Sequence, residues 1–285
     1  MKPTVKSHLV FTLLLFFSTF MLLEMGLFIA HQLLNVQLKW NLFQYCLSGL
    51  NEQTVGHDIT KIMFNVLIMY TLARIFFRIA KQIYMSCKWN RIFHAKENTK
   101  LTKILNSKYR NWNTRFLVVQ DDSFIALTIG MLRPKIIVSS GLLGMFSEQE
   151  TKSILLHEWH HYRNYDPLKI FITTVISDGM GYIPIIRASV RYYKTWSELL
   201  ADRFVIKKMD SVYDLANVLL RLSNLNKVRN YATGVYFANS TINYRIQQVL
   251  EPEKSIHVPF LQTKPVLLSL FVIFVLSSIV MGGCA

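Results

Sequence analysis

The chain has 285 residues, of which 52% are hydrophobic, and a formal net charge of +15. Its positive mean hydropathy is too high for an ordinary soluble domain and predicts membrane-spanning segments. A nucleic-acid-binding protein is the other class that such a charge suggests, but the uneven distribution of the basic residues argues against it.

Three apolar segments predict membrane spans, at residues 9–30, 59–73 and 265–283. Lys2 and Lys6 precede the first segment, so a cleaved signal peptide is its alternative. Because no small-residue cleavage site follows, we expect an uncleaved anchor.

The basic residues lie asymmetrically about the second span. Residues 31–58 hold Lys39 alone, whereas eleven Lys and Arg residues lie between 74 and 115. The positive-inside rule therefore places residues from about 74 to 263 in the cytoplasm of a multi-pass protein of the cell membrane. The basic stretch is expected to lie against the lipid bilayer, with DNA or RNA binding as its alternative. Cys46 and Cys284 would share the outer side, where a disulfide between them is left open.

The segment after the second span predicts a mixed domain. Residues 95–107 have helical character, and three short runs read as strands, at residues 115–120, 125–129 and 135–139. A capping box at Ser147 and Glu150 opens a helix that we expect to end at Asp166-Pro167. A further amphipathic helix starts near Ser211.

Residues 168–190 are apolar but are interrupted by Lys169, Asp178 and Pro184. A single crossing here would place the two halves of the domain on opposite sides of the membrane. We therefore expect this segment to pack against the core or to dip into the bilayer without crossing. The predicted parts are a membrane region at 1–84, a cytoplasmic domain at 85–263 and a last span at 264–285.

The stretch His157-Glu158-Trp159-His160-His161 fits the pattern H-E-x-x-H. His157 and His161 lie on one helix face, where both rings can reach one ion, and Glu158 is placed as general base toward a water. His160 lies about 100° away around the helix and is not assigned to the ion. The pattern predicts a peptidase with one zinc ion per chain; a polar helix surface is the alternative.

A catalytic zinc ion takes three protein ligands, so a third must come from another helix. Glu198, in the run S-E-L-L-A-D, is the strongest candidate, and Asp202 is placed to accept a hydrogen bond from a ligand histidine. A solvated helix face is the alternative for this pair. Asp166 either orients a ligand from behind or simply ends the helix, and we slightly favour the helix-ending role.

Two stretches resemble known membrane peptidases. Residues 129–166, with G-M-L-R-P-K-I-I-V-S-S-G-L-L and H-E-W-H-H-Y-R-N-Y-D, resemble the BlaR/MecR-type metallopeptidases. The E-L-L-A-D run is similar to the E-x-x-A-D of the related HtpX and CAAX-protease group. The resemblance covers about residues 115–250. It implies an integral membrane α+β protein, with about three transmembrane helices around a zincin-like, mainly α-helical catalytic domain that has a small β-sheet.

The resemblance also implies roles for single residues. Glu198 would be the third zinc ligand, and residues 135–139 would be an edge strand that holds an extended substrate. Arg245, in I-N-Y-R-I, matches an arginine that stabilises the oxyanion; an ordinary salt bridge is its alternative. The histidine that accompanies this arginine in the relatives is absent, with Asn239 nearby.

The BlaR/MecR sensors carry a β-lactam-binding domain after their last span, and we expect none here because the sequence stops at Ala285. The expected function is a zinc endopeptidase that cleaves a protein on the cytoplasmic side, with a transcriptional repressor as the natural substrate. One alternative is HtpX-like quality control of membrane proteins. Another is a non-catalytic, zinc-stabilised signal transducer.

Overall fold

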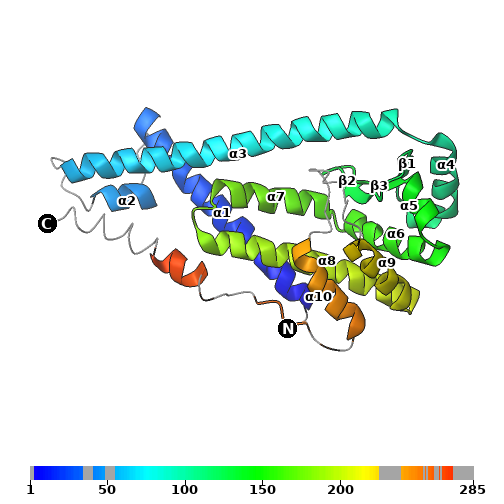
Figure 1. The fold of residues 1–285 in the computed structure, drawn as a ribbon. Helices are drawn as coiled ribbons and strands as arrows, with labels where there is room; N and C mark the ends of the chain where they lie inside the picture. Colours follow the sequence, from blue (N-terminus) through cyan, green and yellow to red (C-terminus); the bar gives the residue numbers. More distant parts are fainter. Residues whose placement is uncertain are drawn as a thin grey trace. The chain divides into compact units, whose positions relative to one another are not determined.

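The computed structural model describes residues 3–34, 41–48, 55–224, 239–252, 254, 256–259, 263 and 265–271. Its helices and strands are drawn in Figure 1, which labels all of them except the 3-10 helix. They are α1 (Pro3–Leu34), α2 (Leu42–Ser48), α3 (Val55–Ala95), α4 (Thr99–Lys108), the 3-10 helix η1 (Arg110–Trp112), β1 (Phe116–Val119), β2 (Ala126–Ile129), β3 (Lys135–Ser139), α5 (Ser140–Met145), α6 (Glu148–Arg163), α7 (Asp166–Gly179), α8 (Pro184–Met209), α9 (Tyr213–Asn224) and α10 (Asn239–Leu250).

The chain divides into two compact units. Unit 1 comprises Met1–Ile79, Thr173–Tyr192 and Pro259–Ala285, and unit 2 comprises Ala80–Ile172 and Tyr193–Val258. The mainly helical character with a small sheet is confirmed, while the zincin-like arrangement stays a prediction. The predicted domain boundaries also stay predictions.

Unit 1 contains two helices that are long and apolar enough to cross a membrane, at Val5–Leu34 and within Val55–Ala95. They include the first two predicted spans. Much of their apolar surface is exposed, as at Phe16, Val66 and Met69, whereas a core helix of a soluble protein would bury such side chains. The helical part of the third predicted span covers 265–271, and residues 272–283 lie outside the described residues, as does Cys284. The number of spans and the pairing of Cys46 therefore stay predictions.

The buried residues of unit 1 include one acid in the first candidate span. The carboxylate of Glu24 accepts a hydrogen bond from the backbone N–H of Leu42 at 2.8 Å, and Asn41 donates to the carbonyl of Glu24 at 2.9 Å. Asn41 also caps α2 by accepting from Phe43 and Gln44. These bonds satisfy the polar groups of Glu24 and hold α2 against α1.

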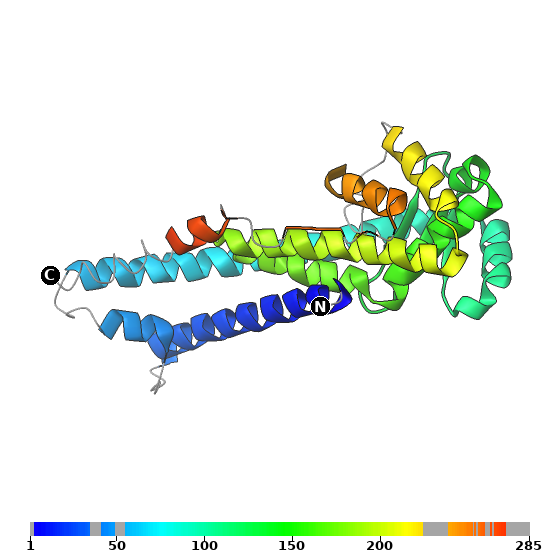
Figure 2. The ribbon, with the colours of Figure 1, turned by 90° about the horizontal axis from the view of Figure 1, so that it is seen from below.

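Residues 173–192 form a helical hairpin within unit 1 (Figure 2). The end of α7 and the start of α8 are joined by a short turn, closed by a hydrogen bond from the N–H of Ile183 to the carbonyl of Met180. A hairpin returns the chain toward the side from which it came, which is compatible with a segment that does not cross the membrane. Its position in or outside a bilayer stays a prediction.

The sheet of unit 2 has the strand order β1-β3-β2. β1 pairs with β3 in parallel, and β2 pairs with β3 in antiparallel, with Thr128 opposite Ile136. The three predicted strands are confirmed within one or two residues at their ends. However, β3 is the central strand, so the prediction that residues 135–139 form an edge strand is wrong. Strand order depends on how the chain between β1 and β2 crosses the sheet, which the residue pattern of a single strand does not record.

Each face of the sheet packs against helices of unit 2. On one face, Val118, Ile136 and Val138 pack against Ile154 and Leu155 of α6. On the other face, Leu117, Leu127 and Ile137 pack against Phe93 and Trp89 near the end of α3. This alternation along the strands places α6, which carries the H-E-x-x-H run, directly on the sheet.

Both ends of α6 are set by local interactions. The predicted capping box is confirmed, because Ser147 accepts from the N–H of Glu150 and Glu150 accepts from the N–H of Ser147. α6 ends at Arg163, and Tyr165 has a positive φ of 53°. Asp166 is the first residue of α7 and not the end of α6, as the sequence had suggested, because the left-handed residue before it ends one helix and Pro167 favours the start of the next.

Candidate metal centre

Two histidines of α6 face one point in unit 2. His157 and His161 are one turn apart and almost completely buried. Their Nε2 atoms are 3.1 Å apart. Their position on one face follows from the helix repeat, and both rings are covered by side chains of α7, α8 and α10.

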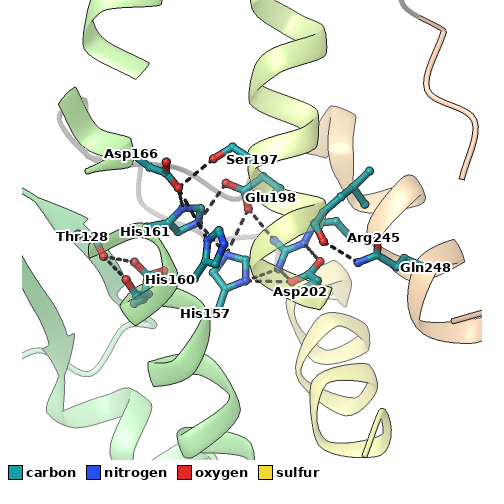
Figure 3. Close-up of polar contacts among 12 residues, drawn as sticks. Thr128, His157, His160, His161, Asp166, Ser197, Glu198, Asp202, Arg245 and Gln248 are labelled. Carbon is teal, nitrogen blue, oxygen red and sulfur yellow. Dashed lines mark hydrogen bonds and ion pairs between the residues drawn. The ribbon is translucent and has the colours of Figure 1, made fainter. Parts of the chain in front are cut away.

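Glu198 brings the third group from α8 (Figure 3). Its Oε2 lies 3.4 Å from Nε2 of His157, and its Oε1 lies 3.6 Å from Nε2 of His161. A zinc ion bound tetrahedrally at about 2.0–2.1 Å would separate its ligand atoms by about 3.3 Å. The spacing and the chemistry of these three buried groups therefore fit a divalent metal ion such as zinc.

A carboxylate lies behind each histidine. Nδ1 of His157 is 2.9 Å from Oδ1 of Asp202, and Nδ1 of His161 is 2.7 Å from Oδ2 of Asp166. Ser197 also donates to Asp166, at 3.2 Å. These bonds put a ring proton on each Nδ1 and direct each Nε2 atom toward the position of the metal ion. Asp166 therefore contacts a candidate ligand from behind and begins α7, whereas the helix-ending role suggested by its sequence position is not seen.

A second group of possible metal ligands comprises His160, His161 and Asp166. Here the Nδ1 atom of His161 is already bonded to Asp166, and the His160 ring accepts from Asn164. Burial and the neighbouring charge of His161 lower the pKa of His160 to about 3, so its ring is neutral at physiological pH. The exclusion of His160 from the three-ligand group is consistent with its position around the helix.

Arg245 of α10 is fully buried against the same group. Its Nε and Nη2 atoms donate to the two carboxylate oxygens of Asp202, both at 2.6 Å, and its Nη1 atom donates to Glu198 at 3.2 Å. Arg245 therefore forms salt bridges, as in the alternative to its predicted oxyanion role. The oxyanion role stays a prediction, and Asn239 is the first residue of the same helix.

Glu158 is held by a residue that the sequence did not single out. The Thr128 hydroxyl, on β2, is 2.8 Å from Oε2 of Glu158 and 2.9 Å from its carbonyl oxygen. Both side chains are buried. Thr128 is the one polar residue in the apolar strand β2, and this pattern could have indicated its role from the sequence. Gln248, one turn after Arg245, was also missed: it donates to the carbonyl of Leu199 at 2.9 Å and accepts from Arg203.

The charges of the site are closely coupled. Burial by itself lowers the pKa of His161, but its hydrogen bond to Asp166 and the charge of Glu198 raise it to about 9. Burial raises the pKa of Glu198 and of Asp202, but the adjacent histidines and Arg245 bring both below their ordinary values. The two carboxylates are therefore ionised at neutral pH, as a metal ligand and its supporting group require.

Comparison with known proteins adds two findings. The sequence model of the family described as BlaR1 peptidase M56 matches residues 49–249, a range that includes every residue of the centre. The Regulatory protein BlaR1 of Bacillus licheniformis is 28% identical over 103 residues, which cover 35% of this chain and 17% of that protein.

Proposed function

The chain belongs to the BlaR1 peptidase M56 family, and on this premise we propose that it is a membrane-bound zinc endopeptidase that cleaves a protein on the cytoplasmic side. The observation that carries the proposal is the close grouping of His157, His161 and Glu198, whose nitrogen and oxygen atoms lie 3.1, 3.4 and 3.6 Å apart. The two apolar helices and the family support membrane association. The basic residues after the second span support the cytoplasmic side.

The residues of the centre divide the chemistry of peptide hydrolysis. A zinc ion held by the three ligands would polarise the scissile carbonyl and lower the pKa of a water molecule. Glu158 takes a proton from the attacking water and delivers it to the leaving amine. Thr128 fixes the Glu158 carboxylate in one orientation, while Asp202 and Asp166 fix the two ligand rings.

The outer edge of β2 is a second observation in favour of an extended protein substrate. The N–H of Ser139 donates to the carbonyl of Ile125, so by alternation Leu127 and Ile129 also face β3. The backbone groups of Thr128 then point away from the sheet, beside Glu158. Among the residues that the structure describes, nothing pairs with this edge, and a peptide in extended conformation can add to it.

We favour a regulatory protein as the substrate of this peptidase. The relative from Bacillus licheniformis carries the name of a regulatory protein, and the sequence resembles the BlaR/MecR-type peptidases around its H-E-x-x-H run. A transcriptional repressor is then the expected substrate.

The test is a proteome comparison between cells with the wild-type protein and cells with Glu158→Gln. The proposal predicts that one intact repressor accumulates with the variant and that its cleaved form disappears. Accumulation of many membrane proteins would instead indicate quality control. A variant that signals normally and changes no protein would indicate a non-catalytic transducer.

A further inference from the structure

A cavity of about 430 Å³ lies in unit 2, between the end of α3 and one end of the sheet. Cys87 and Asn90 line it from α3, and Arg115 and Lys135 line it from the sheet. The turn between β2 and β3 contributes Gly130, Arg133 and Pro134. No residue of the candidate metal centre lines this cavity.

The backbone brings three basic side chains to this cavity. Arg115 directly precedes β1, and its carbonyl accepts from the N–H of Ile136, so Arg115 and Lys135 are neighbours across the parallel pair. Gly130 has a φ of +96°, and a Cβ atom there would lie 2.5 Å from the carbonyl oxygen of Arg133. Only glycine allows so tight a turn, and Arg133 in this turn lines the cavity together with Lys135.

The cavity carries positive charge without an internal counter-ion. None of its lining residues is acidic, and Arg115 and Arg133 are exposed, with no side-chain hydrogen bond or ion pair to the described part of the chain. Lys135 donates to Asn90 and contacts His94, whose ring is itself 3.4 Å from Glu97. Burial lowers the pKa of Lys135 despite the charge of Glu97, so an anion entering the cavity would stabilise its ammonium group.

Two residues that line the cavity are close in sequence to residues of the candidate metal centre. Gly130 is two residues beyond Thr128, which holds Glu158, and Pro167 directly follows Asp166, which holds His161. A peptide paired antiparallel with the outer edge of β2 would run from Gly130 toward Ala126. Its residues on the N-terminal side of the cleaved bond would therefore lie nearest to the cavity.

We propose that this cavity is a specificity pocket that binds an aspartate or glutamate of the protein substrate, a few residues before the cleaved bond. The proposal rests on the proposed endopeptidase function. Arginine is suited to the role because its planar guanidinium group forms paired hydrogen bonds with a carboxylate. An anionic lipid headgroup is the competing occupant, but the closeness in sequence of Gly130 to Thr128 and of Pro167 to Asp166 favours the substrate.

The first experiment measures binding without cleavage. Cys87 is exposed and lines the pocket, so an occupant should protect its thiol from a neutral reagent such as iodoacetamide. The zinc-loaded, full-length Glu158→Gln protein in detergent is incubated with random neutral ten-residue peptides that carry one Asp. A matched pool carries Asn at the same position, and mass spectrometry follows the Cys87 peptide.

We expect the Asp pool to slow the modification of Cys87 by about tenfold relative to the Asn pool, the effect of one charge-assisted hydrogen-bonded pair. The double variant Arg115→Ala, Arg133→Ala should lose this protection. Arg110→Ala should keep it, because Arg110 is an exposed arginine outside the pocket. Equal protection by both pools would overturn the proposal. So would protection by a short-chain phosphatidylglycerol but not by the Asp pool.

The second experiment uses the wild-type protein and the same pools as substrates. Preferential cleavage a few residues after Asp supports the pocket and the peptidase together. Protection of Cys87 without any cleavage would leave the pocket standing and refute the endopeptidase function. Cleavage with no preference and no protection would refute the pocket alone.

Discussion

Arg245 and Asp202 form a bidentate ion pair in the interior of unit 2, with both nitrogen–oxygen distances at 2.6 Å. Asp202 also bonds the ring of His157, and Arg245 also donates to Glu198. The pair therefore connects two of the three proposed metal ligands and ties α10 to both α6 and α8. A guanidinium group held in this way positions ligands, and it also contacts the His157 ring, with Nη2 at 3.4 Å from Nδ1.

Arg245→Gln should destabilise the folded protein by about 3–5 kcal/mol, because it leaves the buried carboxylates of Asp202 and Glu198 without their cation. Thermal unfolding in detergent measures this effect. Arg110→Gln is the matched control and should unfold like the wild type, since Arg110 is exposed. Equal melting temperatures for the Arg245 variant and the wild type would show that the ion pair does not form.

Thr128→Val should lower kcat by about 10- to 100-fold, the loss expected for one hydrogen bond to a charged group. The variant keeps the shape of the side chain but cannot donate to Glu158. Zinc content should not change, and Thr128→Ser, which restores the hydroxyl, should recover most of the rate. A Thr128→Val protein with the wild-type rate would remove Thr128 from the mechanism.

Asp202→Asn and Asp166→Asn should each weaken zinc binding by about 10- to 100-fold, because each removes the acceptor that orients a ligand histidine. Competition with a chelator measures the affinity. Asp210→Asn is the control, since Asp210 is exposed and its left-handed backbone suits asparagine equally well. If Asp166→Asn binds zinc normally, Asp166 serves only as the start of α7.

The raised pKa of His161 predicts opposite pH trends for the metal-free and zinc-loaded proteins. Its folded value, about 9, exceeds the unfolded value of 6.5. The interactions of the protonated ring therefore stabilise the metal-free protein fully below pH 6.5, and this contribution is lost as the pH rises through 9. Zinc must displace that proton, so zinc affinity should fall by about tenfold per pH unit below pH 9. Calorimetry in buffers of different ionisation enthalpy measures the released proton; no release at pH 7 would contradict the assignment.

Local sequence patterns were sufficient for the elements that carry the centre. The i, i+4 spacing fixed His157 and His161 on one face, and the capping box at Ser147 defined the start of their helix. The partners that complete the centre are distant in sequence: Arg245 lies 88 residues from His157, and Thr128 lies 30 from Glu158. No periodicity specifies such contacts, since they arise when the sheet, α8 and α10 pack around α6. The order of the strands could not be predicted either, because it also depends on contacts between residues distant in sequence.

We propose that His157, His161 and Glu198 hold one zinc ion at which Glu158 drives peptide hydrolysis. The most direct test of this proposal is to measure zinc content and peptide cleavage together, for the purified full-length protein, Glu158→Gln and His161→Ala. We expect one zinc ion per chain in the wild type and in Glu158→Gln, and cleavage by the wild type alone. His161→Ala should lose both zinc and cleavage. Cleavage by Glu158→Gln at the wild-type rate, or full zinc content in His161→Ala, would contradict the proposal.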